Sequence, residues 1–136
     1  MKKVWGFMRS DRSTFPYWFA HWCAYQMVAL DLKVWRPKFL LHDIEKPWLR
    51  LFMNYKRVQK FHRTHSNHHL EYGFRNGWDK MDWLALVIDW ECCHYTKIEE
   101  PFNARETLEN ELSGKWKPYR EDIRPKVEKV LDSLDL

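Results

Sequence analysis

The sequence contains little glycine, with four residues in a chain of 136. It has few strand-turn signals and no Asn-Gly pair flanked by alternating apolar residues, which argues against a sheet. No apolar run approaches the ~20 residues that a membrane-spanning helix needs. The N-terminus begins like a signal peptide, but Arg9, Asp11 and Arg12 interrupt the apolar region that such a peptide requires. We therefore expect no membrane association.

Cysteine is scarce, and its pattern is a poor disulfide framework. The three residues are Cys23 and the adjacent pair Cys92 and Cys93. An odd count with one adjacent pair predicts a reducing, cytoplasmic location. The net charge of +4 is mild and suits an anionic ligand. The basic residues of the chain are spread along the sequence rather than gathered in a stripe, so nucleic-acid binding is not expected.

The composition is that of an ordinary globular domain, with 45% apolar and 31% charged residues. A chain of this length favours one domain over residues 1–136 and can bury a core without disulfides. Nine Trp, eight Phe and six Tyr predict a core built from large flat side chains. Oligomeric state is left open, and a homo-oligomer is compatible with the sequence.

Apolar residues recur at helical spacing between the prolines, so we expect an all-α bundle of five or six helices. The metal-site core would span about residues 14–95, and residues 102–136 would form outer helices. Expected helices run from Ser13 or Thr14 to about Leu32, from Lys38 to Glu45, from Pro47 through His62 to His69, from Met81 to about Tyr95, from Ala104 to Leu112, and from Glu121 to Leu134.

The doublet His42-Asp43 is followed by Lys46, giving the pattern H-D-x-x-K. Adjacent His and Asp side chains reach one cation if the backbone turns between them, and both are common metal ligands. The alternative interpretation of so short a motif is a capped or salt-bridged turn.

Four histidines, His62, His65, His68 and His69, occupy eight consecutive positions. On one helix, His62, His65 and His69 would share a face, and pairs three or four residues apart are able to grip one ion. The alternative is a polar stripe, or core histidines bonded to the backbone. So dense a group favours a metal or phosphate site.

Asp89 lies inside the apolar run Leu84–Trp90, where an unpaired carboxylate would be costly. It needs a partner, which is either a metal or a Lys, Arg or His side chain. Asp82, seven residues earlier, is better explained as a helix cap or first-turn acid. His21 has aromatic neighbours that predict burial, and by itself it would be a structural histidine.

The order His21, His42-Asp43, the histidine cluster and Asp89 resembles the HD-domain metal-dependent phosphohydrolases, which are all-α proteins. The segments L-L-H-D-I-E-K and H-S-N-H-H-L-E-Y also resemble an uncharacterised phage and bacterial branch of HD-like proteins. The resemblance implies one or two divalent ions of Mn, Fe, Co, Ni or Zn. It implies His21, His42, Asp43 and Asp89 as metal ligands, and His65, His68 and His69 as second-metal or phosphate contacts.

The expected activity is hydrolysis of a nucleotide or small phosphoester by a metal-activated water. Lys46, Arg63 and Lys60 would neutralise the phosphate, and Glu71 would be an acid or base or a hydrogen-bond partner of a histidine. Two other hypotheses keep the scaffold: a di-iron oxygenase of the HD type, and a non-catalytic protein that binds a nucleotide or a partner.

Overall fold

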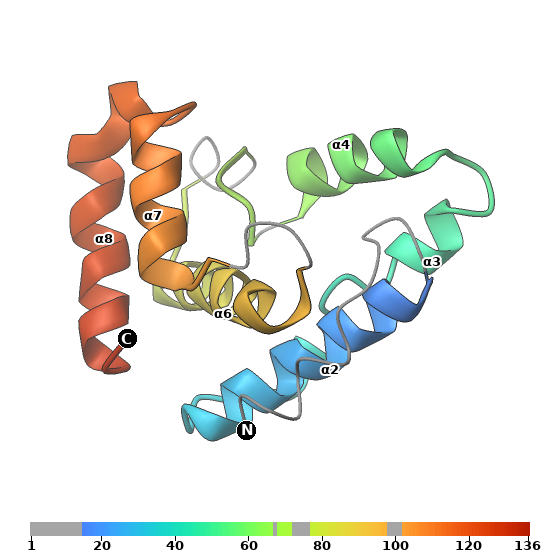
Figure 1. The fold of residues 1–136 in the computed structure, drawn as a ribbon, viewed down its shortest axis with the longest axis horizontal. Helices are drawn as coiled ribbons and strands as arrows, with labels where there is room; N and C mark the ends of the chain where they lie inside the picture. Colours follow the sequence, from blue (N-terminus) through green and yellow to red (C-terminus); the bar gives the residue numbers. More distant parts are fainter. Residues whose placement is uncertain (1–14, 67, 72–76, 98–101) are drawn as a thin grey trace.

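Every regular element in the described part of the chain, residues 15–66, 68–71, 77–97 and 102–136, is a helix (Figure 1). This computed structural model therefore confirms the all-α prediction. The elements are α2 (Phe15–Asp31), the 3-10 helix η2 (Pro37–Leu41), α3 (Lys46–Leu49), α4 (Tyr55–His65), α6 (Lys80–Thr96), α7 (Ala104–Ser113), the 3-10 helix η3 (Lys117–Tyr119) and α8 (Arg120–Ser133). None of these helices combines the length and apolar character needed to cross a membrane.

Helix α6 is the centre of the fold, with α2 crossing one side and α7 and α8 packed on the other (Figure 1). It begins with a capping box, in which the Asp82 N–H donates to Asp79 Oδ1 at 3.0 Å and the Asp79 N–H donates to Asp82 Oδ2 at 3.1 Å. Asp82 is therefore a first-turn cap, as predicted. Because α6 is covered on two sides, buried residues follow most of its circumference, and Asp89 lies among them.

Most buried apolar residues of the described part of the chain belong to two clusters that meet at α6. One joins α2 and η2 to α6 and contains Ala24, Tyr25, Val28, Ala29, Phe39, Ile88 and Cys92. The other joins α6 to α7 and α8 through mainly aliphatic residues, among them Leu86, Val87, Leu108, Leu112, Ile123, Val127 and Leu131.

The core of the described residues is aromatic only in part, because Tyr17, Tyr25, Phe39, Trp83 and Trp116 are buried but most other buried apolar side chains are aliphatic. Several indoles instead lie at the boundary and donate their N–H to the chain. Trp18 Nε1 donates to the Asp43 carbonyl at 2.8 Å, and Trp22 Nε1 to the Leu40 carbonyl at 3.0 Å. A large ring with one polar group is well placed at such a boundary.

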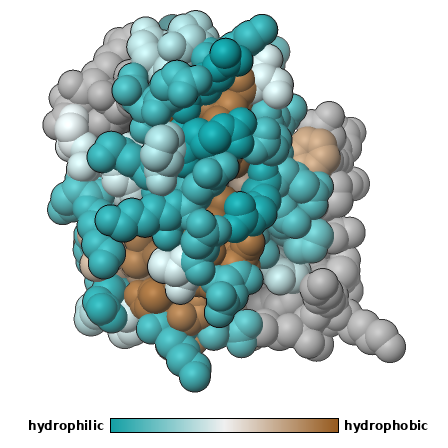
Figure 2. Space-filling model, turned by 90° about the vertical axis from the view of Figure 1, so that its left-hand side faces the viewer, coloured by the Kyte–Doolittle hydropathy of each residue, from teal (hydrophilic) through white to brown (hydrophobic). Residues whose placement is uncertain are grey.

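Helices α7 and α8 form the outer layer that the sequence predicts. Figure 2 shows their face as mostly hydrophilic, with hydrophobic residues visible between the polar side chains. Asn103 caps α7 by accepting from the Glu106 N–H at 2.9 Å. Arg124 of α8 donates to Glu109 of α7, which ties the two helices together at the surface.

The single long helix predicted from Pro47 to His69 is wrong, because the chain breaks it twice. Helix α3 ends at Leu49, and Asn54 starts α4 by accepting from the Arg57 N–H at 3.0 Å. Helix α4 then ends at His65, because Ser66 is extended with φ −102° and ψ 132°. The apolar periodicity continues across both breaks, so it does not reveal them, and the end of α4 redirects His68 and His69.

Candidate metal centre

Four predicted ligands converge on one buried point from three parts of the chain. His21 comes from α2, His42 and Asp43 from the turn after η2, and Asp89 from α6. His21 Nε2 lies 2.9 Å from Asp89 Oδ1 and 3.1 Å from His42 Nε2. His42 Nε2 lies 3.2 Å from Asp89 Oδ1, and both imidazoles are 3.4 Å from Asp43 Oδ2. The first set of donor atoms is therefore two nitrogens and two oxygens.

The backbone turn that the doublet needs is present at Asp43, whose φ is +55°. A left-handed conformation costs an L-residue about 1–2 kcal/mol and persists where the surroundings enforce it. Here the Trp18 indole and the Lys46 N–H both donate to the Asp43 carbonyl, at 2.8 and 3.1 Å. The Tyr25 ring stacks on His42 at 3.7 Å. These contacts hold two adjacent side chains toward the same centre.

A second set of donors surrounds the other oxygen of Asp43. Asp43 Oδ1 lies 2.8 Å from His62 Nε2 and 3.1 Å from His68 Nε2, and these two nitrogens are 3.1 Å apart. His69 belongs to the same group, because the four candidate ligand atoms lie within 4.8 Å of one another. Asp43 therefore faces two sets of ligands, one through each carboxylate oxygen.

The second set fits a cation better than a hydrogen-bond network. Asp43 Oδ1 is buried and has no hydrogen-bond partner within the described residues, although His62 Nε2 and His68 Nε2 are close enough. His69 Nε2 is also buried without a partner there. Buried polar atoms are rarely left unsatisfied, and a shared ion would satisfy all of them.

Both carboxylates are held in the charged form that metals require. Burial raises the pKa of Asp43, but His42, Lys46 and His62 outweigh it and hold the pKa well below its usual range. Burial likewise opposes ionisation of Asp89, and the hydrogen bonds from His21 and His42 bring its pKa well below normal. Burial lowers the pKa of His42 to about 4, so that its imidazole is neutral at pH 7.

Two other imidazoles, those of His21 and His62, have raised pKa values, in contrast to His42. Burial lowers the pKa of His21, but contacts with Asp43 and Asp89 outweigh it and raise the pKa well above its usual value. The pKa of His62 is raised as well, because Asp43 and Glu45 outweigh the effect of burial. A proton on either imidazole would offset the charge of the neighbouring carboxylates, and a divalent ion would take the place of such protons.

His62 and Glu45 are site residues that sequence reasoning did not assign. His62 Nδ1 contacts Glu45 Oε1, and the Ser66 hydroxyl donates to the same oxygen at 3.2 Å. This contact orients the ring so that Nε2 faces Asp43, as carboxylates do for metal-binding histidines. His62 belongs to the dense group of histidines at positions 62–69, and this grouping indicates that it is a candidate ligand. Nothing in the sequence around Glu45, two residues after Asp43, indicates a role in the site.

Other predicted site residues lie apart from the two ligand sets. His65 is exposed at the end of α4, where its ring stacks on Phe61 at 4.1 Å and Nδ1 is 2.8 Å from the Phe61 carbonyl. Because α4 ends there, His65 does not share an inward face with His69. Lys60 is also exposed on α4.

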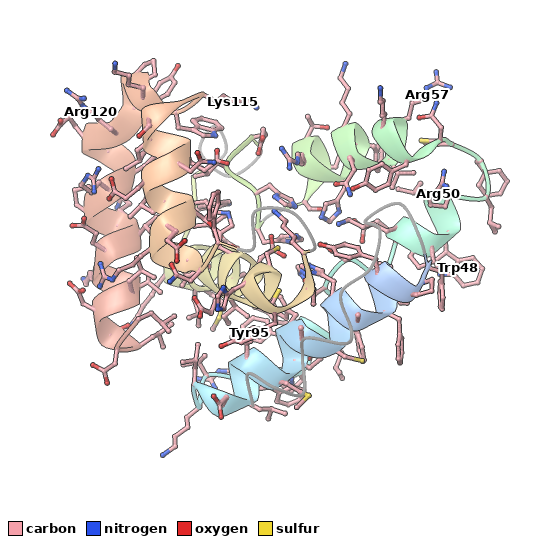
Figure 3. All side chains as sticks on the ribbon, in the orientation of Figure 1. Trp48, Arg50, Arg57, Tyr95, Lys115 and Arg120 are labelled. Atoms are coloured by element: carbon pink, nitrogen blue, oxygen red, sulfur yellow. The ribbon has the colours of Figure 1, made fainter. Side chains whose placement is uncertain are left out.

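Arg63 and Glu71 line a cavity beside the centre rather than the centre itself. Arg63 Nη1 lies 3.8 Å from Glu71 Oε1, and Lys115 Nζ lies 3.0 Å from the same oxygen. Because the Glu71 carboxylate is paired with two basic side chains, it is better suited to orienting them than to transferring a proton. Figure 3 labels Lys115, which lies just after the C-terminal end of α7.

Two cysteines of α6 offer a different partner for His21. Cys92 Sγ lies 3.6 Å from His21 Nδ1, and His21, Asp89, Cys92 and Cys93 could form a further ligand group. His21 thus presents Nε2 to the carboxylates and Nδ1 to the thiol. An ion in the first His/Asp set would bind His21 through Nε2, the nitrogen that faces Asp89 at 2.9 Å.

Two cavities lined by described residues reach the centre. The larger, of about 460 Å³, has a polar and basic wall that includes Lys56, Arg63 and Lys97. The smaller, of about 330 Å³, is mainly apolar and aromatic. His21 and Lys46 belong to the walls of both. A ligand at the centre would therefore have one charged and one apolar space beside it.

Comparison with protein-family models, curated proteins and solved structures finds no match.

Proposed function

We propose that this chain is a metal-dependent phosphohydrolase of the HD type, acting on a nucleotide or small phosphoester at two divalent ions bridged by Asp43. The observation that carries the proposal is the division of the Asp43 carboxylate between two ligand sets, the first buried and the second partly buried. A pair of divalent ions supplies an activated water and orients the phosphoryl oxygens of an ester. The order of the ligands along the chain supports the same family.

The donor atoms favour a transition metal. The first set, His21, His42, Asp43 and Asp89, mixes imidazole with carboxylate, and the second set is richer in imidazole. Imidazole suits Zn, Fe, Co, Ni and Mn, whereas Mg and Ca prefer an all-oxygen environment. We therefore expect Mn, Fe, Co, Ni or Zn rather than Mg or Ca.

Lys46 is the residue best placed to bind the phosphate. Its Nζ lies 2.7 Å from Asp43 Oδ2, and its side chain lines both cavities. Burial lowers the pKa of Lys46, but Asp43 outweighs it and raises the pKa, so the ammonium stays charged. A phosphate oxygen at the centre would accept a charge-assisted hydrogen bond from it. Arg63 would attract the anion from the wall of the polar cavity.

The test is release of inorganic phosphate by protein reconstituted with Mn, Co, Ni, Zn or Fe. Mono- and triphosphate nucleotides and small esters are the substrates. Asp43→Asn should abolish turnover and keep the helical circular-dichroism spectrum, because Asn adopts positive φ more readily than most residues. Asp31→Asn, which removes an exposed carboxylate at the end of α2, is the matched control.

Undiminished turnover by Asp43→Asn would contradict the proposal, as would absence of turnover with every metal. The apolar cavity would also admit an uncharged organic substrate, which favours the di-iron oxygenase as second candidate. Oxygen consumption by the iron-loaded protein, without phosphate release, would identify that activity.

A further inference from the structure

The smaller cavity leads from the protein surface to the metal centre. Phe15 and Leu51 line it and are 63% and 71% exposed, whereas Asp43, in the same wall, is 2% exposed. The wall carries four aromatic rings, from Phe15, Tyr17, Trp18 and Tyr55. An apolar passage that ends at buried charged ligands is suited to a molecule with one apolar and one charged end.

Two of the four aromatic rings in this wall contact the candidate metal ligands. Trp18 donates its indole N–H to the Asp43 carbonyl at 2.8 Å, so the ring is tied to the ligand turn. Tyr17 stacks on His21, with ring centroids 5.8 Å apart and planes 17° apart. Rings whose positions are already set lose little freedom when a ligand binds, which favours affinity.

The two cavities divide the space around the centre by polarity. The polar cavity carries the basic side chains of Lys56, Arg63 and Lys97, whereas Arg50 is the one basic side chain that lines only the smaller, mainly apolar cavity. Lys46 belongs to both, with its ammonium beside Asp43. A phosphate at the centre would therefore leave its organic substituent in the apolar cavity.

We propose that the apolar cavity binds the organic part of the substrate and that this part is an aromatic ring, as in an aryl or nucleobase-bearing phosphoester. The proposal rests on the proposed function, because it assumes a phosphate at the centre. A volume of about 330 Å³ is at the lower end for ligand pockets and suits one ring system. Aromatic walls favour a flat group through stacking, in addition to excluding water.

Phosphonates test the cavity without depending on turnover. Isothermal titration of the metal-loaded protein with phenylphosphonate, methylphosphonate and octylphosphonate compares three substituents on one charged group. We expect phenylphosphonate to bind about tenfold or more tightly than methylphosphonate, since burying one ring is worth at least that factor. We also expect it to bind more tightly than octylphosphonate.

Substitutions at the exposed end of the apolar cavity test whether this cavity is the source of the preference for phenylphosphonate. Phe15→Ala combined with Leu51→Ala should lower the phenyl-to-methyl affinity ratio by about five- to tenfold, because both side chains lose contact with the ring. Phe52→Ala is the matched control. Phe52 is 84% exposed, follows Leu51 and is absent from the cavity wall, so its removal should leave the ratio unchanged.

Equal affinity for phenyl- and methylphosphonate would contradict the proposal that the cavity binds an aromatic group. If the protein still released phosphate from esters, the proposed phosphohydrolase activity would be retained. Tighter binding of octylphosphonate would overturn the aromatic group in favour of an alkyl substrate. Preferential phenylphosphonate binding without turnover of any ester would support the cavity and overturn the hydrolase. Failure of the metal-loaded protein to bind any phosphonate would overturn both.

Discussion

Lys46 places its ammonium 2.7 Å from Asp43 Oδ2, the oxygen that His21 Nε2 and His42 Nε2 face at 3.4 Å. The H-D-x-x-K motif is therefore a structural unit, in which the third residue after the aspartate returns to its carboxylate. A permanent positive charge at this position opposes cation binding and favours a bound anion. Substitution of Lys46 can therefore separate the binding of the metal ions from the binding of the phosphate.

Lys46→Gln should keep both metals and weaken phosphate binding. Loss of a charge-assisted hydrogen bond is worth about 1.5–3 kcal/mol, so kcat/KM for a phosphoester should fall roughly 10- to 100-fold. Elemental analysis and steady-state kinetics measure the two effects separately. The control is Lys60→Gln, which removes an exposed lysine of α4 that lines neither cavity. Loss of metal with unchanged kcat/KM would reverse the role assigned to Lys46.

His65 and His68 form a matched pair for the second ligand set. His68→Gln should lower metal content, because His68 Nε2 lies 3.1 Å from Asp43 Oδ1. His65→Gln should leave metal content unchanged, because His65 is exposed and bonded to the backbone of α4. Elemental analysis of both variants checks this. An equal loss of metal from the two would place His65 in the centre.

The thiols of α6 should not be ligands of the resting centre. We expect Cys92→Ser combined with Cys93→Ser to leave metal content unchanged, because His21 directs Nε2 toward Asp89 at 2.9 Å and only Nδ1 toward Cys92 Sγ at 3.6 Å. Inductively coupled plasma analysis of the variant measures the content. A loss of one equivalent would show that an ion is held by the sulfur group instead.

Metal affinity should fall as the pH falls. The pKa of His21 is held well above its usual value and the pKa of His62 is raised, so protons compete with an ion for both imidazoles. An ion must displace them, so binding is expected to release about one to two protons and to strengthen with rising pH. Titration calorimetry at pH 7 in two buffers of different ionisation enthalpy counts these protons. Identical apparent enthalpies in the two buffers would contradict this.

Local signals predict much of the architecture. The α7 boundaries follow from apolar spacing and the cap at Asn103, and the Asp79–Asp82 capping box explains why Asp82 is not a ligand. Asp89 was also readable, because a carboxylate in a long apolar run requires a buried partner. Such features depend on neighbours within one helical turn, which the sequence displays directly.

Other features depend on contacts between distant segments. Asn54 caps α4 in the middle of a continuing apolar pattern, so periodicity alone joined α3 to α4. The role of Glu45 depends on His62, which lies 17 positions away and on another element. The division of the histidine run, with His65 outside and His68 inside, follows from the end of α4 at Ser66. Helical spacing does not show where a helix stops.

Metal stoichiometry of three variants tests the bridging role of Asp43 most directly. The wild-type protein should hold about two equivalents of a transition metal, because Asp43 faces two ligand sets. Asp89→Asn and His62→Gln, each confined to one set, should each retain about one equivalent, and Asp43→Asn should retain almost none. Two equivalents in Asp43→Asn, or no loss from either of the other variants, would contradict a shared carboxylate at the heart of the site.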